Sequence, residues 1–383
     1  MKYRQQNCDL LVVGAGASGV SAAVAAARNG ASVILLEQNK FPGGTAVIAR
    51  HNFICGVDCN SQVLLKEILD RIAPKEKLIK RGKVFLLPFK TKQMVLALTR
   101  IIKFEKRIKV FYNCKAASVK RAGNRIVSVS AKKGDSKILI KPKIVIDASG
   151  EGELIKLSKA KYKISRLSKR QLSGFSFLVK RIKGDNALLA WKVPYYLMQG
   201  FKSKELPEYS RFSLYSPTGL QGEGFIRVNL AASPQNKGDK DINKKAVIIH
   251  NYLRKALPEF KKSYITYVPP CLCNRESVRL LGEYTLSKGD VLAGRKFPDA
   301  VVSGSWPIEF WHRNGPVFTY LKKNSFYEIP LRSLKSKNIA NLFATGRCIS
   351  ADAYALASTR VLGTCISLGE AAGIAASKLC ASF

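Results

Sequence analysis

The chain has 383 residues, of which 46% are hydrophobic, and it carries a formal net charge of +39. This length allows two domains with a large core, and the composition excludes a disordered or low-complexity chain. No apolar run reaches the roughly 20 residues that a membrane-spanning helix needs, and the N-terminus lacks a secretory signal, so we expect a cytoplasmic protein. Its nine scattered cysteines are then expected to be reduced thiols.

The positive charge comes mostly from lysines that are spread along the whole chain. A solvated lysine surface accounts for this distribution, and weak non-specific binding of polyanions at low salt follows from the charge in any case. The sequence contains none of the usual nucleic-acid-binding motifs. A basic nucleic-acid-binding protein nevertheless stays open as an alternative to an enzyme.

The first predicted elements are a strand, a helix and a second strand. Apolar residues predict a buried strand over 9–13 and another over 32–36, and an alanine-rich stretch between them predicts a helix over 18–28. Gly30 is expected to end the helix, and Glu37 stands at the end of the second strand. This order is typical of the βαβ unit of a doubly wound sheet.

Gly14, Gly16 and Gly19 form a GxGxxG pattern between the first strand and the helix. In this pattern the first glycine permits a tight turn, the second lets the backbone approach a pyrophosphate, and the third lets the helix pack closely on the sheet. The helix N-terminus offers N–H groups and a positive dipole end to the phosphates. Glu37 lies 18 residues after Gly19, where a carboxylate can accept hydrogen bonds from ribose hydroxyls. The segment therefore predicts a dinucleotide site.

The next part of the chain mixes helices with strands. We expect a loop at Gly43 and Gly44, then mainly helix over 61–105 with a short apolar hairpin at 84–89. Alternating residues, separated by Gly-Asn and Gly-Asp turn signals, then predict a three-stranded meander. Its strands are expected over 108–119, 125–132 and 137–147.

The rest of the chain divides into a β-rich region and a return to α/β character. Residues 160–335 show several strand-like runs and one strong helix, expected over about 240–257. After them we expect a strand over 341–344, a turn at 345–347 and a helix of small residues over 364–382. Small residues let a helix pack tightly against its neighbours.

Several sequence blocks together resemble the FAD-dependent oxidoreductases of the glutathione-reductase-like flavoprotein fold. More narrowly, the chain resembles the family related to heterodisulfide-reductase flavin subunits, and the resemblance runs nearly end to end. The blocks are GAGASG with Glu37, FPGGTA, IDASGEGEL, RESVRLLGEYTLSKGDVLAGRKFPDAV, YEIPLRSL, NLFATGRCISAD and STRVLGTCISLGEAAGIAA.

The resemblance implies an α/β fold with a Rossmann-like FAD-binding domain, a β-meander and an inserted β-rich substrate domain. The FAD-binding domain is expected to combine residues 1–60, 106–157 and 338–383. Residues 61–105 should pack alongside as a helical segment, and residues 158–337 should form the substrate domain. The activity implied is hydride transfer between flavin N5 and a small molecule, which the sequence does not identify.

The resemblance also assigns cofactor-binding residues block by block. The first turn should hold the pyrophosphate, Glu37 the ribose, and the loop at 43–45 should pass near the pyrophosphate and the flavin. Val119, at the end of a meander strand, should read adenine through its backbone. The relatives often carry Asp where Arg347 stands, so the ribitol partner is open, and Asp352 is a substitute. The full set is Gly14, Gly16, Ala17, Ser18, Gly19, Glu37, Gly43, Gly44, Thr45, Val119, Ser149, Gly150, Gly346, Arg347, Gly363 and Thr364.

Two residues are candidates for the chemistry itself. Arg360 directly precedes the last helix, whose N-terminus should point at the flavin C2 carbonyl, so Arg360 should face the flavin or an anionic substrate. His312 is a candidate proton donor or acceptor. A surface arginine and a hydrogen-bonded interior imidazole are the structural alternatives. Arg275 and Arg279 bind a substrate carboxylate or build an ion-pair network.

The cysteines leave a second redox chemistry open. Cys55 and Cys59 form a CxxxC pair that a flavin thiol/disulfide reductase could use, although Cys55 comes ten residues after Thr45 rather than directly after the loop. Cys271 and Cys273 form a CxC pair, and buried free thiols are the simpler interpretation of all four. We expect no metal site. The chain has no second GxGxxG with its helix and acid, so electrons should come from the substrate, a carrier protein or a transient nicotinamide.

Overall fold

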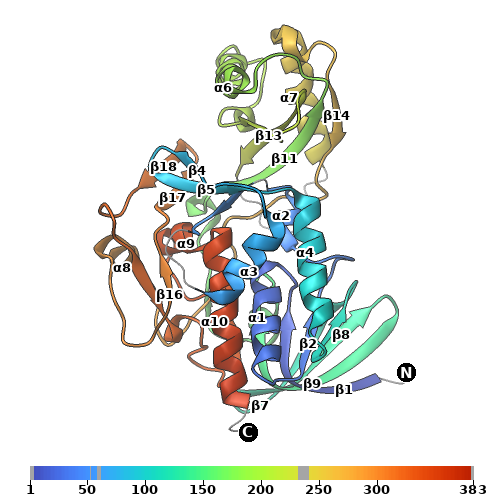
Figure 1. The fold of residues 1–383 in the computed structure, drawn as a ribbon, viewed down its shortest axis with the longest axis vertical. Coiled ribbons are helices and arrows are strands. Elements are labelled where there is room, and N and C mark those ends of the chain that lie inside the picture. The colour runs from blue at the N-terminus through green and yellow to red at the C-terminus, as the bar shows by residue number, and fades with distance from the viewer. Residues whose placement is uncertain (1–3, 52, 58–61, 232–240, 381–383) are drawn as a thin grey trace.

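The computed structural model describes residues 4–51, 53–57, 62–231 and 241–380. Its lower part, as drawn in Figure 1, is built on one large sheet with the strand order β6-β2-β1-β9-β8-β7, and β20 also pairs with β9. β6, β2, β1, β9 and β20 run parallel, whereas β8 and β7 continue from β9 as an antiparallel meander. The strands are β1 (Arg4–Val13), β2 (Val33–Leu36), β6 (Ile108–Phe111), β7 (Lys115–Ala122), β8 (Arg125–Lys133), β9 (Ser136–Asp147) and β20 (Leu342–Ala344). The doubly wound sheet with a meander predicted from the sequence is confirmed.

The meander differs from the prediction in one place. The single strand expected over 108–119 is two strands, because the chain turns between β6 and β7, where Asn113 has a φ of 53°. β6 pairs with β2 in parallel, and β7 pairs with β8 in antiparallel orientation. The alternating apolar pattern continues through both strands, so it cannot show that they pair with different neighbouring strands.

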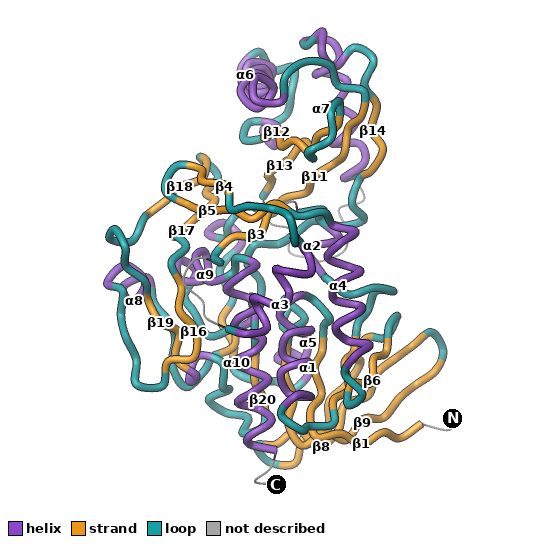
Figure 2. Tube along the Cα trace, in the orientation of Figure 1, coloured by secondary structure: helices purple, strands orange, loops and turns teal. Residues whose placement is uncertain are grey.

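Two helices of small residues lie side by side on this sheet (Figures 1 and 2). They are α1 (Ala17–Arg28) and α10 (Leu362–Cys380). A Cβ on Gly369 or Gly373 would overlap the carbonyl oxygens of Ser18 or Ala22, so the two backbones touch where these glycines lie. α3 (Val63–Ile72) and α4 (Thr91–Phe104) pack alongside α1 and α10.

Short elements join these layers at the upper edge of the sheet. The expected hairpin over 84–89 is β5 (Val84–Pro88), which pairs with β4 (Ile79–Arg81) and with β3 (Phe53–Cys55). The loop expected at 43–44 is partly wrong, because Gly44 begins the helix α2 (Gly44–Ile48). α5 (Glu153–Leu157) follows β9.

A separate lobe lies above the sheet (Figure 1). It contains a sheet of order β12-β13-β11-β14. Its own apolar core is built from residues such as Phe177, Leu197 and Ile249. The elements are β11 (Ser173–Lys180), α6 (Asn186–Lys202), β12 (Leu214–Pro217), β13 (Glu223–Leu230), α7 (Ile242–Ala256) and β14 (Tyr264–Tyr267).

The expectation of one strong helix in this region is wrong, because α6 is a second long helix. Asp185 caps its N-terminus, and its carboxylate accepts a hydrogen bond of 2.9 Å from the N–H of Leu188. Pro194 lies inside it and weakens the sequence signal for a helix. Tertiary packing of Leu189, Val193 and Leu197 into the lobe core overrides that signal.

The remaining residues before β20 pack against the main sheet rather than into the lobe. Val302, Phe310 and Tyr327 belong to the same apolar core as α1 and α10. The elements are β10 (Tyr162–Lys163), β15 (Arg279–Leu280), α8 (Lys288–Ala293), β16 (Ala300–Gly304), β17 (Ile308–His312), β18 (Gly315–Thr319) and β19 (Tyr327–Pro330); α9 (Ala353–Thr359) follows β20. Within the described ranges, no helix is long and apolar enough to cross a membrane.

Candidate functional site

The packing of the chain explains some glycines of the first turn but not all of them. A Cβ on Gly14, where φ is 100°, would lie 2.6 Å from the carbonyl oxygen of Ala148, and a Cβ on Gly19 would overlap the carbonyl oxygen of Gly14. Gly16 has an ordinary φ of −62°, and a Cβ there would meet no atom within 4 Å. The packing of the chain therefore requires Gly14 and Gly19, whereas Gly16 borders open space at the N-terminus of α1.

Glu37 is tied to the same turn. Its Oε2 accepts a hydrogen bond of 2.7 Å from the N–H of Ala15, and its Oε1 accepts bonds of 2.8 and 2.6 Å from the backbone N–H and side-chain amide of Asn39. Only 4% of Glu37 is exposed, and burial raises the pKa of its carboxyl. Oε2 accepts only one hydrogen bond from the described residues and keeps acceptor capacity, so the carboxylate can both fix the turn and accept from a ligand hydroxyl.

The second glycine segment lies directly beside the first. The N–H of Gly43 donates to the carbonyl oxygen of Ala15 at 2.8 Å, and a Cβ on Gly44 would lie 3.0 Å from Cα of Gly16. Gly43 has a φ of 113°, which favours glycine. The two segments together form one backbone surface, which includes Ala17 at the first turn of α1.

Arg347 joins three predicted segments. Its Nη1 donates to Oγ1 of Thr45 at 2.9 Å, and its Nη2 donates to the carbonyl oxygen of Gly150 and to Oε1 of Glu151, both at 3.3 Å. Its Nε is buried without a partner among the described residues. The guanidinium therefore holds the turn after β20 against the glycine loop and the end of β9.

Hydroxyl groups reinforce the same junction. Oγ of Ser18 lies 2.8 Å from Oγ1 of Thr345, next to Gly346. Oγ of Ser149 donates at 2.6 Å to Asp147, a fully buried carboxylate that also accepts from the N–H of Ile155 at 3.0 Å. Burial raises the pKa of Asp147.

The positions of Val119 and Asp352 differ from those expected of an adenine contact and a ribitol contact. Val119 lies inside β7 rather than at its end, and the meander residue beside Glu37 is Cys114, whose N–H donates to the carbonyl oxygen of Glu37 at 2.8 Å. At 3.3 Å per residue, Val119 is roughly 16 Å farther along the strand. Asp352 caps α9, and its oxygens accept from the N–H groups of Tyr354, Ala355 and Lys288. Asp352 is thus occupied by a structural role.

The start of α10 closes against β3. A Cβ on Gly363 would overlap the carbonyl oxygen of Gly56, and Oγ1 of Thr364 is buried without a partner among the described residues. Arg360 ends α9 just before this point. Its Nη2 donates to the carbonyl oxygen of Glu309 at 3.0 Å and to Oε1 of Gln171 at 3.4 Å. Burial lowers the pKa of Arg360.

Arg275 contacts neighbouring residues of the same two chain segments, 171–172 and 309–311. Its Nη1 donates to the carbonyl oxygen of Leu172 at 2.6 Å, and its guanidinium lies over the ring of Trp311, 4.4 Å from the centroid. Burial, and then the charge of Arg360, lower the pKa of Arg275 to about 9. Arg279 instead lies beside Glu276 at 3.2 Å, in an ion pair.

The charges of Arg275 and Arg360 act on His51. Burial, and then the charges of Arg227, Arg275, Arg360 and Arg347, lower the pKa of His51 to about 3. His312 ends β17 with its ring 4.4 Å from that of Phe310. Because side chains alternate along a strand, Phe310 and His312 lie on the opposite face of β17 from Glu309 and Trp311. The sequence carries no signal for His51, since it lies outside the helices and strands and is distant in the sequence from these arginines.

The described cysteines are free thiols. Burial raises the pKa of Cys273 to about 12 and also raises that of Cys271, which favours thiols over the reactive thiolates. Cys59 lies outside the described residues, so the CxxxC pair stays a prediction. No group of three or more His, Cys, Asp or Glu side chains within the described part of the chain could hold a metal ion.

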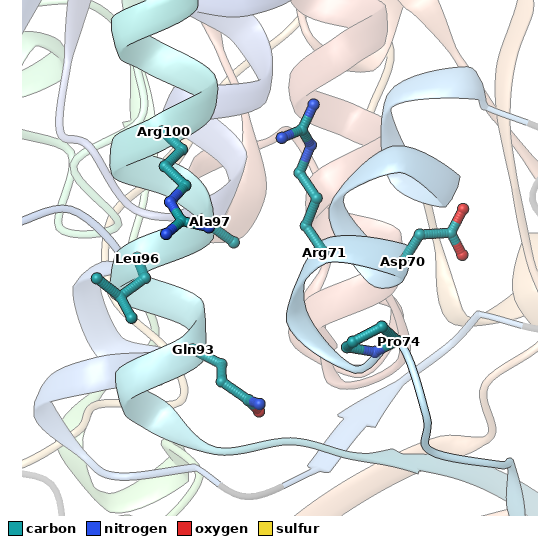
Figure 3. A pocket seen from close by; sticks show the side chains of 7 residues that line it. All are labelled: Asp70, Arg71, Pro74, Gln93, Leu96, Ala97 and Arg100. Atoms are coloured by element: carbon teal, nitrogen blue, oxygen red, sulfur yellow. The ribbon is translucent and has the colours of Figure 1, made fainter.

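A surface pocket of about 300 Å³ lies between α3 and α4 (Figure 3). Arg71 and Arg100 extend from the two helices toward this space. Its lining residues are Asp70, Arg71, Pro74, Gln93, Leu96, Ala97 and Arg100. None of them belongs to the glycine turns or to the arginines described above, Arg275, Arg347 and Arg360.

Comparisons with known proteins identify the family and the fold of the chain. The chain matches the FAD dependent oxidoreductase family over residues 9–382. It is similar in fold to a geranylgeranyl bacteriochlorophyll reductase-like protein from Thermoplasma acidophilum, with a TM-score of 0.54 and 13% identity over 99% of this chain and 79% of that one. It is also similar to the OxyS anhydrotetracycline hydroxylase from Streptomyces rimosus, with a TM-score of 0.54 and 10% identity over 98% of this chain and 63% of that one.

Short stretches are similar to curated proteins. The chain is 54% identical over 39 residues to sarcosine oxidase subunit alpha of Rhizobium meliloti (strain 1021), which is 10% of this chain and 4% of that protein. It is 52% identical over 42 residues to 4-oxocyclohex-2-ene-1-carboxylate 5-dehydrogenase of Sinomonas cyclohexanicum, which is 11% of this chain and 7% of that protein. The family match, in contrast, spans nearly the whole chain. The protein therefore belongs to the FAD dependent oxidoreductase family, as an enzyme whose cofactor is FAD.

Proposed function

We propose that this enzyme oxidises or reduces a small molecule by hydride transfer to or from N5 of FAD, which binds along the two glycine segments. The observation that carries the proposal is Gly16, which the packing of the chain does not require and which borders open space at a helix N-terminus. A pyrophosphate is the group that such a surface accepts.

The residues of this region fit FAD. Gly16 and the adjoining Gly43 and Gly44 would hold the pyrophosphate, and Glu37 would accept from the adenosine ribose. The buried Nε of Arg347, which has no partner among the described residues, is a further donor for a phosphate or the ribitol. Bound FAD supplies a two-electron acceptor or donor at N5.

The chain's own residues would position and shelter the reacting group. The N-terminus of α10 at Gly363 and Thr364 would direct its positive dipole end toward the flavin. Trp306, Val361 and Leu86 form a small apolar cluster beside β3 that would exclude water from this side. Arg360, which directly precedes Val361 of that cluster, would contribute a fixed positive charge.

The flavin would receive electrons from the substrate, a carrier protein or a transient nicotinamide, as the sequence leaves open. Thiol/disulfide chemistry through Cys55 and Cys59 has less support, because Cys55 comes ten residues after Thr45 rather than directly after the loop. Nucleic-acid binding has no support beyond the net charge of +39.

Anaerobic bleaching of the purified holoenzyme tests the proposal. A library of metabolites is mixed with the yellow protein, and its flavin absorbance is followed; photoreduced protein is tested in parallel for reoxidation. We expect at least one compound class to change the flavin's redox state with a stoichiometric product. A holoenzyme whose flavin is photoreducible, but which exchanges electrons with no small molecule in either direction, would contradict it.

A further inference from the structure

We propose that Arg227, Arg275 and Arg360, together with Gln171, bind an oxyanion group of the substrate, either a carboxylate or a phosphate. This inference rests on the proposed function, since it concerns the molecule that meets the flavin. It adds the chemical class of that molecule and the residues that recognise it.

Two short segments bring Arg275 and Arg360 together. Arg360 donates to Gln171 and to the carbonyl oxygen of Glu309, and Arg275 donates to Leu172 and lies over Trp311. The segments 171–172 and 309–311 are themselves paired, because the N–H of Leu172 donates to the carbonyl oxygen of Trp311 at 2.9 Å. The two guanidinium groups are thus held by one small frame, which residues 171–172 and 309–311 form.

Arg227 joins this frame from β13. Nη2 of Arg275 donates at 2.7 Å to Oδ1 of Asn229, two residues along the same strand, and residues two apart lie on the same face of a strand. The backbone of Arg227 is paired in the sheet, but its guanidinium has no hydrogen bond or ion pair with another residue that the structure describes. The charge of Arg227 acts on both Arg275 and His51.

Among the described residues, one carboxylate acts on Arg275 and Arg360. The acidic partner that acts on Arg275 and Arg360 is Glu309, whose two oxygens already accept from the indole N–H groups of Trp306 and Trp311 at 3.2 and 2.7 Å. Grouping like charges away from bulk water is unfavourable unless a counterion is present. Arg227, Arg275 and Arg360 each keep some accessible surface, so a small anion can reach them.

Gln171 provides an independent sign of a missing ligand. It is 1% exposed, and its Oε1 accepts a hydrogen bond from Arg360. This contact identifies Nε2 as the side of the amide that is left to donate. Nε2 of this amide has no partner among the described residues. A buried donor without a partner costs free energy, and an oxyanion between the arginines would satisfy it.

Anion binding to the FAD-loaded enzyme tests this inference without turnover. Acetate, benzoate and inorganic phosphate are titrated at constant ionic strength, with acetamide and benzamide as neutral analogues. The flavin difference spectrum and the melting temperature are both recorded. The same titrations are made with Arg227→Gln and with Arg254→Gln, a control that removes an exposed arginine from α7 of the same lobe.

We expect the carboxylates or phosphate, but not the amides, to perturb the spectrum and raise the melting temperature. Arg227→Gln should weaken this binding roughly tenfold or more, since a hydrogen bond to a charged group is lost. It should also leave the anion-free protein at least as stable as the wild type, because like-charge repulsion is relieved. Arg254→Gln should bind like the wild type.

The two anion classes are distinguished by which of them saturates at the lower concentration. Equal responses to anions and amides, equal binding by the two variants, or no response to any anion would overturn the inference. A protein that binds no FAD would instead contradict the proposed function, and the melting temperature would still report anion binding in that case.

Discussion

Arg347 and Thr45 lie 302 positions apart in the chain, and a hydrogen bond of 2.9 Å from Nη1 to Oγ1 joins them. The same guanidinium contacts Gly150 and Glu151, so one side chain connects three segments that should line the FAD site. We expect this arrangement to be fixed before FAD binds, which lowers the ordering cost of binding.

Replacing Arg347 should therefore weaken FAD binding more than it weakens the fold. Arg347→Gln should raise the Kd for FAD roughly tenfold, and Arg347→Lys should restore it only in part, because lysine lacks the planar fork. Titration of FAD into the deflavinated protein by calorimetry measures this. Arg332→Gln, which removes an exposed arginine paired with Asp299, is the matched control. Equal FAD affinity in both variants would remove Arg347 from the site.

Arg360 should tune the redox potential of the flavin. Arg360→Ala removes a positive charge beside the N-terminus of α10, so the reduced, negatively charged cofactor loses stabilisation and the potential falls. A loss of about 1.4 kcal/mol lowers a two-electron potential by roughly 30 mV. Arg360→Lys should recover part of this change. If Arg360 is only structural, the melting temperature falls while the potential of the folded protein stays the same.

His51 should make the enzyme's stability depend on pH. Its pKa in the folded protein is about 3, below the ordinary value of 6.5, so the unfolded chain binds more protons between these values. Stability is fully present above about pH 6.5 and is lost as pH falls toward 3. His51→Gln should make urea-unfolding free energies between pH 7 and pH 4 less steep, by up to about 1.4 kcal/mol per pH unit. His250, with a pKa of about 4, leaves a residual slope, and an unchanged slope would contradict the assignment.

Local pattern was sufficient to predict the βαβ unit and the antiparallel meander strands, because both depend on contacts that are close in sequence. It failed where the chain changes partner at Asn113 and where packing overrides Pro194 in α6. Both failures are cases in which tertiary contacts decide between local alternatives.

The arginine group illustrates a different limit. Arg227, Arg275 and Arg360 come from separate elements, and no local pattern links them. Strand alternation could have separated His312 from Trp311, since neighbours in a strand face opposite sides. Nothing local could have placed His51 near the arginines.

The FAD content of Gly16→Val tests the central claim most directly, because Gly16 has room for a Cβ in the protein itself. Gly289→Val is the control, since Gly289 lies exposed in α8, where a Cβ would meet only Oγ of Ser287 at 3.6 Å. FAD is released by acid precipitation and quantified by absorbance for the wild type and both variants. We predict about one FAD per chain in the wild type and in Gly289→Val, and folded but colourless protein for Gly16→Val, because the valine would occupy the pyrophosphate's position. Full FAD content in Gly16→Val would contradict the placement of the cofactor.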